Sequence, residues 1–146
     1  MLITNQTNYA LRILMYCALY HPQRATVPKI AEAYRISASQ LFKLLPVLTG
    51  LGVLVASRGR QGGVQLARDP SDISLGSIFR ETETRMVRAE CFQDCGVKCP
   101  FYGQCKLQHI WAELLDSVLK VLDDYSIEDL VANRSQLQQR LGLDNR

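Results

Sequence analysis

The sequence of 146 residues contains one tryptophan, two histidines and no uninterrupted apolar stretch long enough to cross a membrane. The apolar stretch nearest the N-terminus, residues 10–20, is interrupted by Arg12 and has neither the basic leader nor the small-residue cleavage site of a signal peptide. The sequence also has no nucleotide-binding motif and no recognisable acid–base or nucleophile–base pair. These absences predict a cytoplasmic protein that is neither membrane-bound nor an enzyme.

The composition is otherwise that of a globular protein. Hydrophobic residues make up 47% of the chain and charged residues 21%, which excludes a disordered polyelectrolyte. The length suits one domain, or a small domain with an extension. Residues 1–80 carry nine Lys and Arg against three Asp and Glu, whereas residues 81–146 carry eight against eleven. The basic front half favours binding to a polyanion, although a solvated basic face would have the same composition.

Helical periodicity dominates the first third of the chain. The pattern predicts a first helix that is capped by Thr7 or Asn8 and ends near Pro22. A second helix is predicted over residues 27–36, with Pro28 in its first turn.

A third helix is predicted over residues 40–52, after a capping turn at residues 37–39. Pro46 has no backbone N–H and should kink this helix. Two short β-like runs, residues 52–57 and 64–67, flank a glycine-rich turn and predict a hairpin. Three helices followed by a hairpin constitute a winged helix-turn-helix.

The second half of the chain is predicted to be mainly helical. Ser74 can cap a short helix over residues 75–83, after a polar linker. Apolar residues recur every three or four positions from Trp111 to Tyr125. They predict a long amphipathic helix that begins near Gln104 or Cys105 and has more apolar face than one chain covers. A capping box at Ser126 opens another short helix, and a polar tail ends the chain. The predicted fold class is therefore mainly α with a small β wing, extended by a long dimerisation helix.

The start of the third helix carries the residues that we expect to read DNA. In a helix-turn-helix, the N-terminal residues of the second helix face base edges in the major groove. Glutamine can pair with adenine, lysine with guanine, and serine with a base or a phosphate. The expected contacts from this helix are Ser37, Ser39, Gln40 and Lys43. The wing tip adds Arg58, Arg60 and Gln61. A merely solubilising turn is the alternative for the wing tip, whereas a phosphate-binding loop should precede a helix rather than a strand.

Four of the five cysteines lie within fifteen residues, at Cys91, Cys95, Cys99 and Cys105. Clustered cytoplasmic thiols more often bind metal than form disulfides. Zinc sites favour CxxC pairs, whereas a compact run of thiolates with Pro100 directly after one of them is typical of iron–sulfur ligation. Lys98, Lys106 and the start of the following helix would stabilise bound thiolates. Zinc, a disulfide and redox-active thiols are the alternatives for this segment.

The two other potential ligands are assigned elsewhere. Cys17 lies on the apolar face of the first helix, so we assign it to the core. His109 has no obvious partner ligand in the sequence and is expected on a solvated helix surface, as a reserve ligand only.

These motifs together resemble a known family. The segments TNQTNYALRILMYCAL, SASQLFKLLPVLTGLGVL, RGRQGGVQLA, AECF and YSIEDL are similar to segments of the Rrf family of winged-helix iron–sulfur repressors, over residues 2–132. The resemblance implies a homodimer crossed through the long helix and DNA binding by the third helix and the wing. It also implies an iron–sulfur cluster held by three cysteines.

The three ligands that the resemblance implies are Cys91, Cys99 and Cys105. Cys95 departs from the family pattern, and the alternatives for it are a fourth ligand, a substitute for one of the three, or a bystander. The spacing resembles that of the rhizobial iron regulators (RirA) more than that of the nitric-oxide sensors (NsrR) or the cluster-biogenesis regulators (IscR). The fourth ligands of the last two types have no counterpart, because Asn8 and Gln108 stand at the matching positions.

The resulting hypothesis is a homodimeric repressor of iron-uptake genes that binds a pseudo-palindromic operator in double-stranded DNA when a [4Fe-4S] cluster is present. Residues 1–74 would form the DNA-binding domain, and residues 75–146 the cluster-binding loop and the dimerisation helix. The alternatives are a nitric-oxide-sensing repressor, a zinc-stabilised DNA-binding module and, from another class, a small iron–sulfur redox protein.

Overall fold

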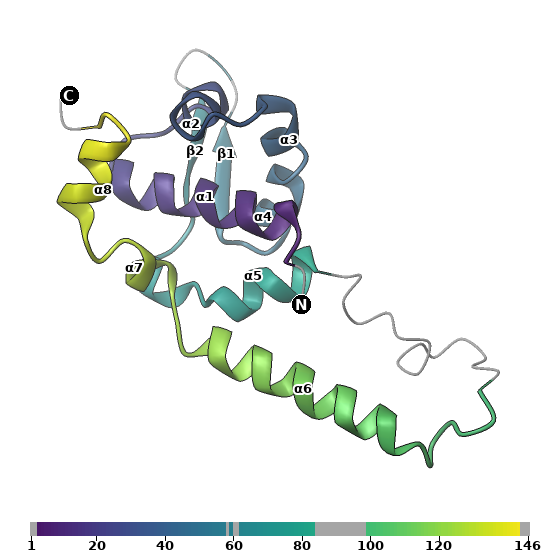
Figure 1. Cartoon of the computed structure of the whole chain (residues 1–146). Helices are drawn as coiled ribbons and strands as arrows, with labels where there is room; N and C mark the ends of the chain where they lie inside the picture. The colour runs from purple at the N-terminus through teal and green to yellow at the C-terminus, as the bar shows by residue number, and fades with distance from the viewer. Residues whose placement is uncertain (1–2, 58, 60–61, 84–98, 144–146) are drawn as a thin grey trace.

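Helix α1 (Asn5–Tyr20) lies at the centre of the fold, and most other elements pack around it (Figure 1). The structure, a computed structural model, describes residues 3–57, 59, 62–83 and 99–143. The remaining elements are, in chain order, α2 (Val27–Tyr34), α3 (Ala38–Phe42), α4 (Leu45–Gly50), β1 (Leu54–Ser57), β2 (Gly63–Leu66), the 3-10 helix η1 (Pro70–Asp72), α5 (Leu75–Thr82), α6 (Lys106–Asp123), α7 (Ile127–Leu130) and α8 (Arg134–Arg140). The predicted fold class, mainly α with a small β wing, is confirmed.

The first helix begins earlier than its sequence pattern indicated. Thr4 is the N-cap residue of α1, whereas Thr7 was one of the two predicted caps. Thr7 instead lies inside the helix and is 3% exposed, with its hydroxyl bonded to the end of α5. The prediction was wrong because a threonine that can cap a helix can equally satisfy its hydroxyl through a distant partner.

The predicted third helix consists of two helices. α3 ends at Phe42 and α4 begins at Leu45, so the prediction of one kinked helix over residues 40–52 was wrong. Pro46 explains the break, because its ring would clash with the carbonyl of the residue four positions earlier, which is Phe42. In the first turn of α4, by contrast, the missing N–H of proline needs no partner.

The wing is a two-stranded antiparallel hairpin, as predicted, in which Leu54 pairs with Leu66. The structure adds a contact that the sequence analysis missed. Ala25, in the segment between α1 and α2, bridges to Val64 through two hydrogen bonds, with N···O distances of 2.9 and 2.7 Å. The wing is therefore attached to the helical body along one edge.

Replacing Gly63 with alanine should loosen this attachment. A Cβ atom at residue 63 would lie 2.7 Å from the backbone oxygen of Ala25, which cannot move aside as a flexible side chain could. We expect Gly63→Ala to lower the free energy of unfolding by about 1–3 kcal/mol, measured by urea denaturation. Gly50→Ala is the matched control, because a Cβ there has no atom within 4 Å and the change should cost no stability. Equal stability of both variants would contradict this account of the wing.

Helices α5 and α6 form the lower layer of the molecule, with α5 between α1 and α6 (Figure 1). Two predicted caps are confirmed: Ser74 accepts a hydrogen bond from the N–H of Ser77 at 3.1 Å, and Ser126 forms a capping box at the start of α7. Arg80 of α5 binds both carboxylate oxygens of Asp123 at the end of α6, and its hydrogen bond lowers the pKa of that carboxyl group. α6 is thus held at its C-terminal end.

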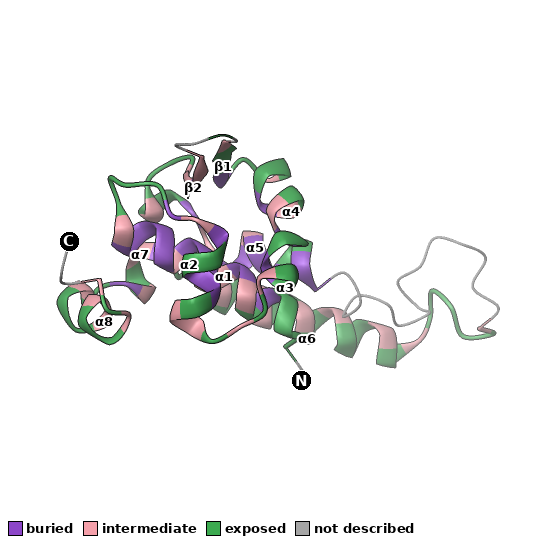
Figure 2. Cartoon of the chain, turned by 90° about the horizontal axis from the view of Figure 1, so that it is seen from above, coloured by how far each residue is buried: buried purple, intermediate pink, exposed green. Residues whose placement is uncertain are grey.

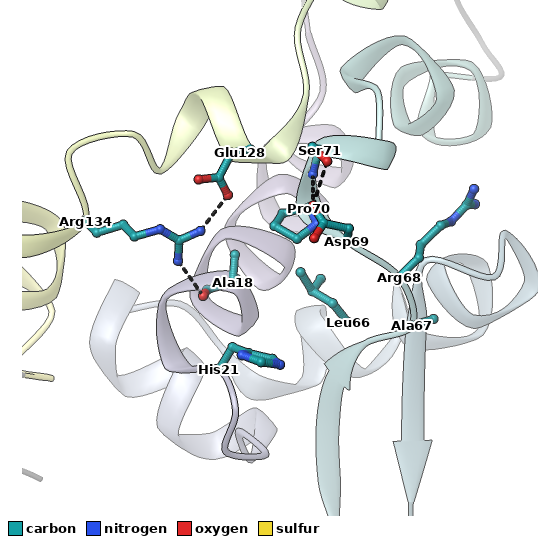
Figure 3. A pocket seen from close by; sticks show the side chains of 10 residues that line it. All are labelled: Ala18, His21, Leu66, Ala67, Arg68, Asp69, Pro70, Ser71, Glu128 and Arg134. Atoms are coloured by element: carbon teal, nitrogen blue, oxygen red, sulfur yellow. Dashed lines mark hydrogen bonds and ion pairs between the residues drawn. The ribbon is translucent and has the colours of Figure 1, made fainter.

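The expected polar tail folds as helix α8 against the end of α1. Arg134 donates to the carbonyl oxygen of Ala18 at 3.0 Å and to Glu128, and Gln138 donates to the carbonyl oxygen of Leu19 at 2.9 Å. Figure 3 shows Arg134 between its two partners, at the edge of a hollow of about 710 Å³. The description as a tail was wrong because polar side chains here satisfy the carbonyl groups that a helix C-terminus leaves free.

Candidate DNA-binding surface and cysteine segment

The residues predicted to read base edges lie together at the start of α3. Ser37 is the N-cap residue of α3, and the exposed side chains of Ser39, Gln40 and Lys43 follow within the next turn. The hydroxyl groups of Ser37 and Ser39 form a hydrogen bond of 2.8 Å. Leu41 is fully buried and anchors the helix in the core. The polar first turn of α3 thus faces outward from an apolar anchor, as the predicted contact with base edges requires.

The segment between α1 and α2 places a basic residue, Arg24, against the wing, and the sequence patterns did not single it out. Arg24 precedes the bridge between Ala25 and the wing, and its guanidinium donates to Gln65 at 3.2 Å and to Ser57. Polar and apolar residues alternate over residues 24–27, and Ala25 and Val27 are buried. This strand-like alternation could have indicated that the segment pairs with the wing. Arg24 therefore adds an exposed cation beside the hairpin, next to the turn end of β1.

The predicted wing-tip contacts, Arg58, Arg60 and Gln61, lie outside the described residues. Beside the hairpin, a hollow of about 870 Å³ separates the wing from α2 and α4. The ring of Phe42, 52% exposed, lines this hollow. Phe42 ends α3, and unlike the buried Leu41 and Leu44 beside it in the sequence, it is exposed. An exposed ring at this position suits apolar contact with thymine methyl groups.

Two of the four clustered cysteines belong to the described residues. Cys99 and Cys105 are half-buried free thiols. Cys105 is the N-cap residue of α6, so its thiol lies at the end of the helix where the macrodipole favours negative charge. Cys91 and Cys95 lie outside the described part of the chain, within which no three potential metal ligands come together. Two thiols, one at a helix N-terminus, form a donor set that fits a thiolate-ligated iron–sulfur cluster.

Cys17 and His109 occupy the environments expected for them. Cys17 is 3% exposed, and its burial raises the pKa of the thiol to about 12. A thiol that stays protonated at neutral pH is a poor metal ligand, so Cys17 belongs to the core as predicted. His109 lies on the exposed surface of α6.

Asn8 and Gln108 stand where the resemblance places the fourth ligands of the other two family types. Asn8 is exposed near the start of α1, and the side chain of Gln108 accepts a hydrogen bond from the N–H of Gly103 at 3.4 Å.

The apolar face of α6 is only half covered. The side that faces α5 carries half-buried residues, which are Leu115, Val118, Leu119 and Leu122. The adjoining part of the apolar face is exposed, and no residue of α6 is buried. The part of α6 that is visible in Figure 2 is coloured intermediate and exposed only. We call this exposed side the outer face of α6, consisting of Leu107, Ile110, Trp111, Leu114 and Val121.

Known proteins are similar to this chain over nearly its whole length. The family Rrf2, described as an iron-dependent transcriptional regulator, matches residues 3–133 of this chain. The chain belongs to this family. Rrf2 proteins are transcriptional regulators rather than enzymes. The predicted family is therefore confirmed, and so is the prediction of a transcriptional regulator that is not an enzyme.

Full-length relatives support membership in the Rrf2 family. Protein aau3 of Rhizobium meliloti (strain 1021) is 42% identical over 144 residues, which cover 99% of this chain and 94% of that protein. The HTH-type transcriptional regulator NsrR of Bacillus subtilis (strain 168) is 38% identical over 142 residues, which cover 97% of each chain. A transcriptional regulator of this kind acts on DNA, so the polar first turn of α3 lies on a DNA-binding protein.

Solved structures of similar shape support the same winged-helix fold. CymR (YrzC), the global cysteine regulator of B. subtilis, has a TM-score of 0.71 and 25% identity, over 91% of this chain and 98% of CymR. IscR of T. potens has a TM-score of 0.73 and 24% identity, over 94% of this chain and 91% of IscR. In the described part of this Rrf2 protein, no helix is both long and apolar enough to span a membrane.

Proposed function

We propose that this Rrf2 protein is a homodimeric repressor that binds a pseudo-palindromic operator when it holds a [4Fe-4S] cluster, and that it controls genes of iron uptake. The position of Cys105 carries this proposal, because this half-buried cysteine is the N-cap residue of α6. A ligand at that position joins the cysteine segment to the long helix. The description of the family as iron-dependent favours iron as the signal.

The outer face of α6 supports the homodimer. Leu107, Trp111 and Leu114 are each between 44% and 53% exposed, and they lie on one side of an 18-residue helix. A row of large apolar side chains on one helix is typical of a protein interface. A second copy of the same helix presents the same row, so a two-fold interface buries both at once.

The cysteines supply the ligands that the cluster requires. Cys99 and Cys105 would hold it together with Cys91, and Cys95 is the candidate for a fourth position. Bound iron and sulfide would supply an oxidation-sensitive and iron-dependent link between these residues. Cys91 follows α5 in the chain and Cys105 is the N-cap residue of α6. A cluster held by both cysteines would therefore connect the chain after α5 to the start of α6. The functional division into residues 1–74 and 75–146 is part of the same proposal.

The experiment that tests this function compares operator binding by the same preparation with and without its cluster. Protein is purified without oxygen, its iron and sulfide are measured, and half of it is stripped with a chelator. Gel-shift titrations at one salt concentration should give a lower dissociation constant for the cluster-containing protein. Equal affinity of the two forms would refute cluster-dependent repression.

Nitric-oxide sensing is the second candidate, because the relatives of 38% identity include NsrR. Increasing doses of a nitric-oxide donor and of an iron chelator separate the two signals. The proposed iron sensor should lose operator binding at the lower dose of chelator. Loss at the lower dose of nitric oxide would reassign the signal and leave the DNA-binding proposal intact.

Removing one cation from the recognition helix should weaken binding. We expect Lys43→Ala to lower operator affinity roughly tenfold, because a lysine at a base edge or a phosphate contributes about 1–3 kcal/mol. Lys120→Ala removes the same charge from the last turn of α6 and should change affinity less than about twofold. Fluorescence anisotropy at constant salt measures both. Similar affinities of the two variants would exclude the start of α3 from the contact surface.

A further inference from the structure

A buried carboxylate joins the beginning of α1 to the end of α5. Glu83, the residue directly after α5, is 2% exposed. Its Oε1 atom accepts hydrogen bonds from the backbone N–H of Thr4 at 2.7 Å, from the hydroxyl of Thr4 at 2.8 Å, and from the hydroxyl of Thr7. The hydroxyls of Thr7 and Thr82 also form a hydrogen bond of 2.7 Å, which links α1 directly to the end of α5. Three donors of the first helix thus hold one oxygen of Glu83.

The second oxygen of the same carboxylate has no hydrogen-bond partner within the described part of the chain. Oε2 of Glu83 is buried, and no donor among the described residues lies within hydrogen-bonding distance of it. A buried oxygen without a partner costs stability, and an apolar side chain of similar size would avoid this cost. The carboxylate does lie at the N-terminus of α1, where the helix macrodipole favours negative charge. Glu83 therefore attaches the end of α5 firmly to α1, but it stabilises the core less than an apolar side chain would.

Glu83 lies between the cysteines that are proposed to bind the iron–sulfur cluster and the helical core that carries the proposed recognition helix. In the chain it directly precedes residues 84–98, which carry Cys91 and Cys95. In space it is bound to α1, whose buried residues share one apolar core with Leu41 of the recognition helix. A displacement of the chain at residue 83 would either break the three hydrogen bonds to Oε1 or move the first turn of α1 with it.

We propose that Glu83 is a positioning residue that transmits the state of the cysteine segment to the recognition helix through the first turn of α1. This role rests on the cluster-dependent DNA binding proposed above. Glu83 contacts neither DNA nor the cysteines in this scheme. It determines how much the affinity for DNA differs between the two states of the protein.

The test measures the ratio of operator affinities with and without the cluster, in anaerobic titrations at one salt concentration. Glu83→Gln keeps an acceptor oxygen but removes its charge, so the three hydrogen bonds from Thr4 and Thr7 become weaker neutral ones. We expect this variant to incorporate wild-type amounts of iron and sulfide and to bind operator within about twofold of wild type when the iron–sulfur cluster is removed. The ratio of operator affinities with and without the iron–sulfur cluster should fall at least about fivefold relative to wild type, which corresponds to the smallest typical allosteric coupling. Hydrogen exchange in the first turn of α1 should differ between the two states in wild type but not in the variant.

Matched variants separate transmission from stability. Glu81→Gln makes the same chemical change at an exposed position of α5 and should keep the wild-type ratio. Thr7→Val removes the hydroxyl donor without changing the shape of the side chain and should lower the ratio, whereas Thr7→Ser keeps the hydroxyl and should restore it. If Glu83→Gln does not fold, the Thr7 pair decides the matter.

Two results would overturn the proposal, and they differ from each other. A wild-type ratio in Glu83→Gln, or in Thr7→Val if the first variant does not fold, removes this role from Glu83 and leaves the proposed function standing. A wild-type protein whose affinity does not depend on the cluster refutes the proposed function, and the role of Glu83 with it.

Discussion

Replacing Cys105 with serine is expected to abolish incorporation of iron and sulfide and to reduce operator affinity to that of the stripped protein. Serine preserves the size of the N-cap side chain, so α6 should still begin at Lys106. Its hydroxyl is a poor ligand for iron in a cluster, because these clusters are held by thiolates. The loss of affinity should lie in the range of allosteric couplings, roughly 5- to 150-fold.

Cys17→Ala is the control for the loss of a thiol. Cys17 is buried and its pKa is raised to about 12, so its removal should leave iron content and operator affinity within about twofold of wild type. Elemental analysis, the visible absorption spectrum and gel-shift titration, all without oxygen, measure both variants. Full iron and sulfide content in Cys105→Ser would remove Cys105 from the ligand set.

Placing a charge on the outer face of α6 should have the second large effect. We expect Leu114→Lys to convert the protein to a monomer, because a dimer interface cannot bury an unpaired ammonium group at low cost. Leu114 is 53% exposed in the single chain, so the change should leave the fold of the monomer intact. A monomer loses simultaneous contact with both half-sites, which should lower operator affinity by roughly 10²- to 10⁴-fold.

Asp116→Lys is the matched control for this substitution. It introduces the same side chain two residues along the helix, on the side opposite to the outer face, where it should remain solvated. Sedimentation equilibrium gives the oligomeric state, and gel-shift titration gives the affinity. A dimeric Leu114→Lys would show that the subunits associate through another surface.

The features that sequence reasoning predicted correctly depend on near neighbours in the chain. The capping serines Ser74 and Ser126 bond residues three positions ahead, and the apolar repeat of α6 follows from helical geometry alone. The exposed first turn of α3 follows from the same periodicity. The break before α4 was also a local effect, but its extent depends on the clash of Pro46 with a carbonyl four residues earlier, which the prediction underestimated.

Local patterns in the sequence were enough to predict the class of fold, the family and the residue types of both candidate sites. The packing of distant segments, by contrast, leaves part of the apolar face of α6 uncovered, places α8 against the end of α1 and attaches the wing to Ala25. It also decided that Glu83 is buried against Thr4, 79 residues away in the chain. Hydrogen bonds between such distant residues form only when the whole core brings two helix ends together, and no local periodicity encodes that meeting.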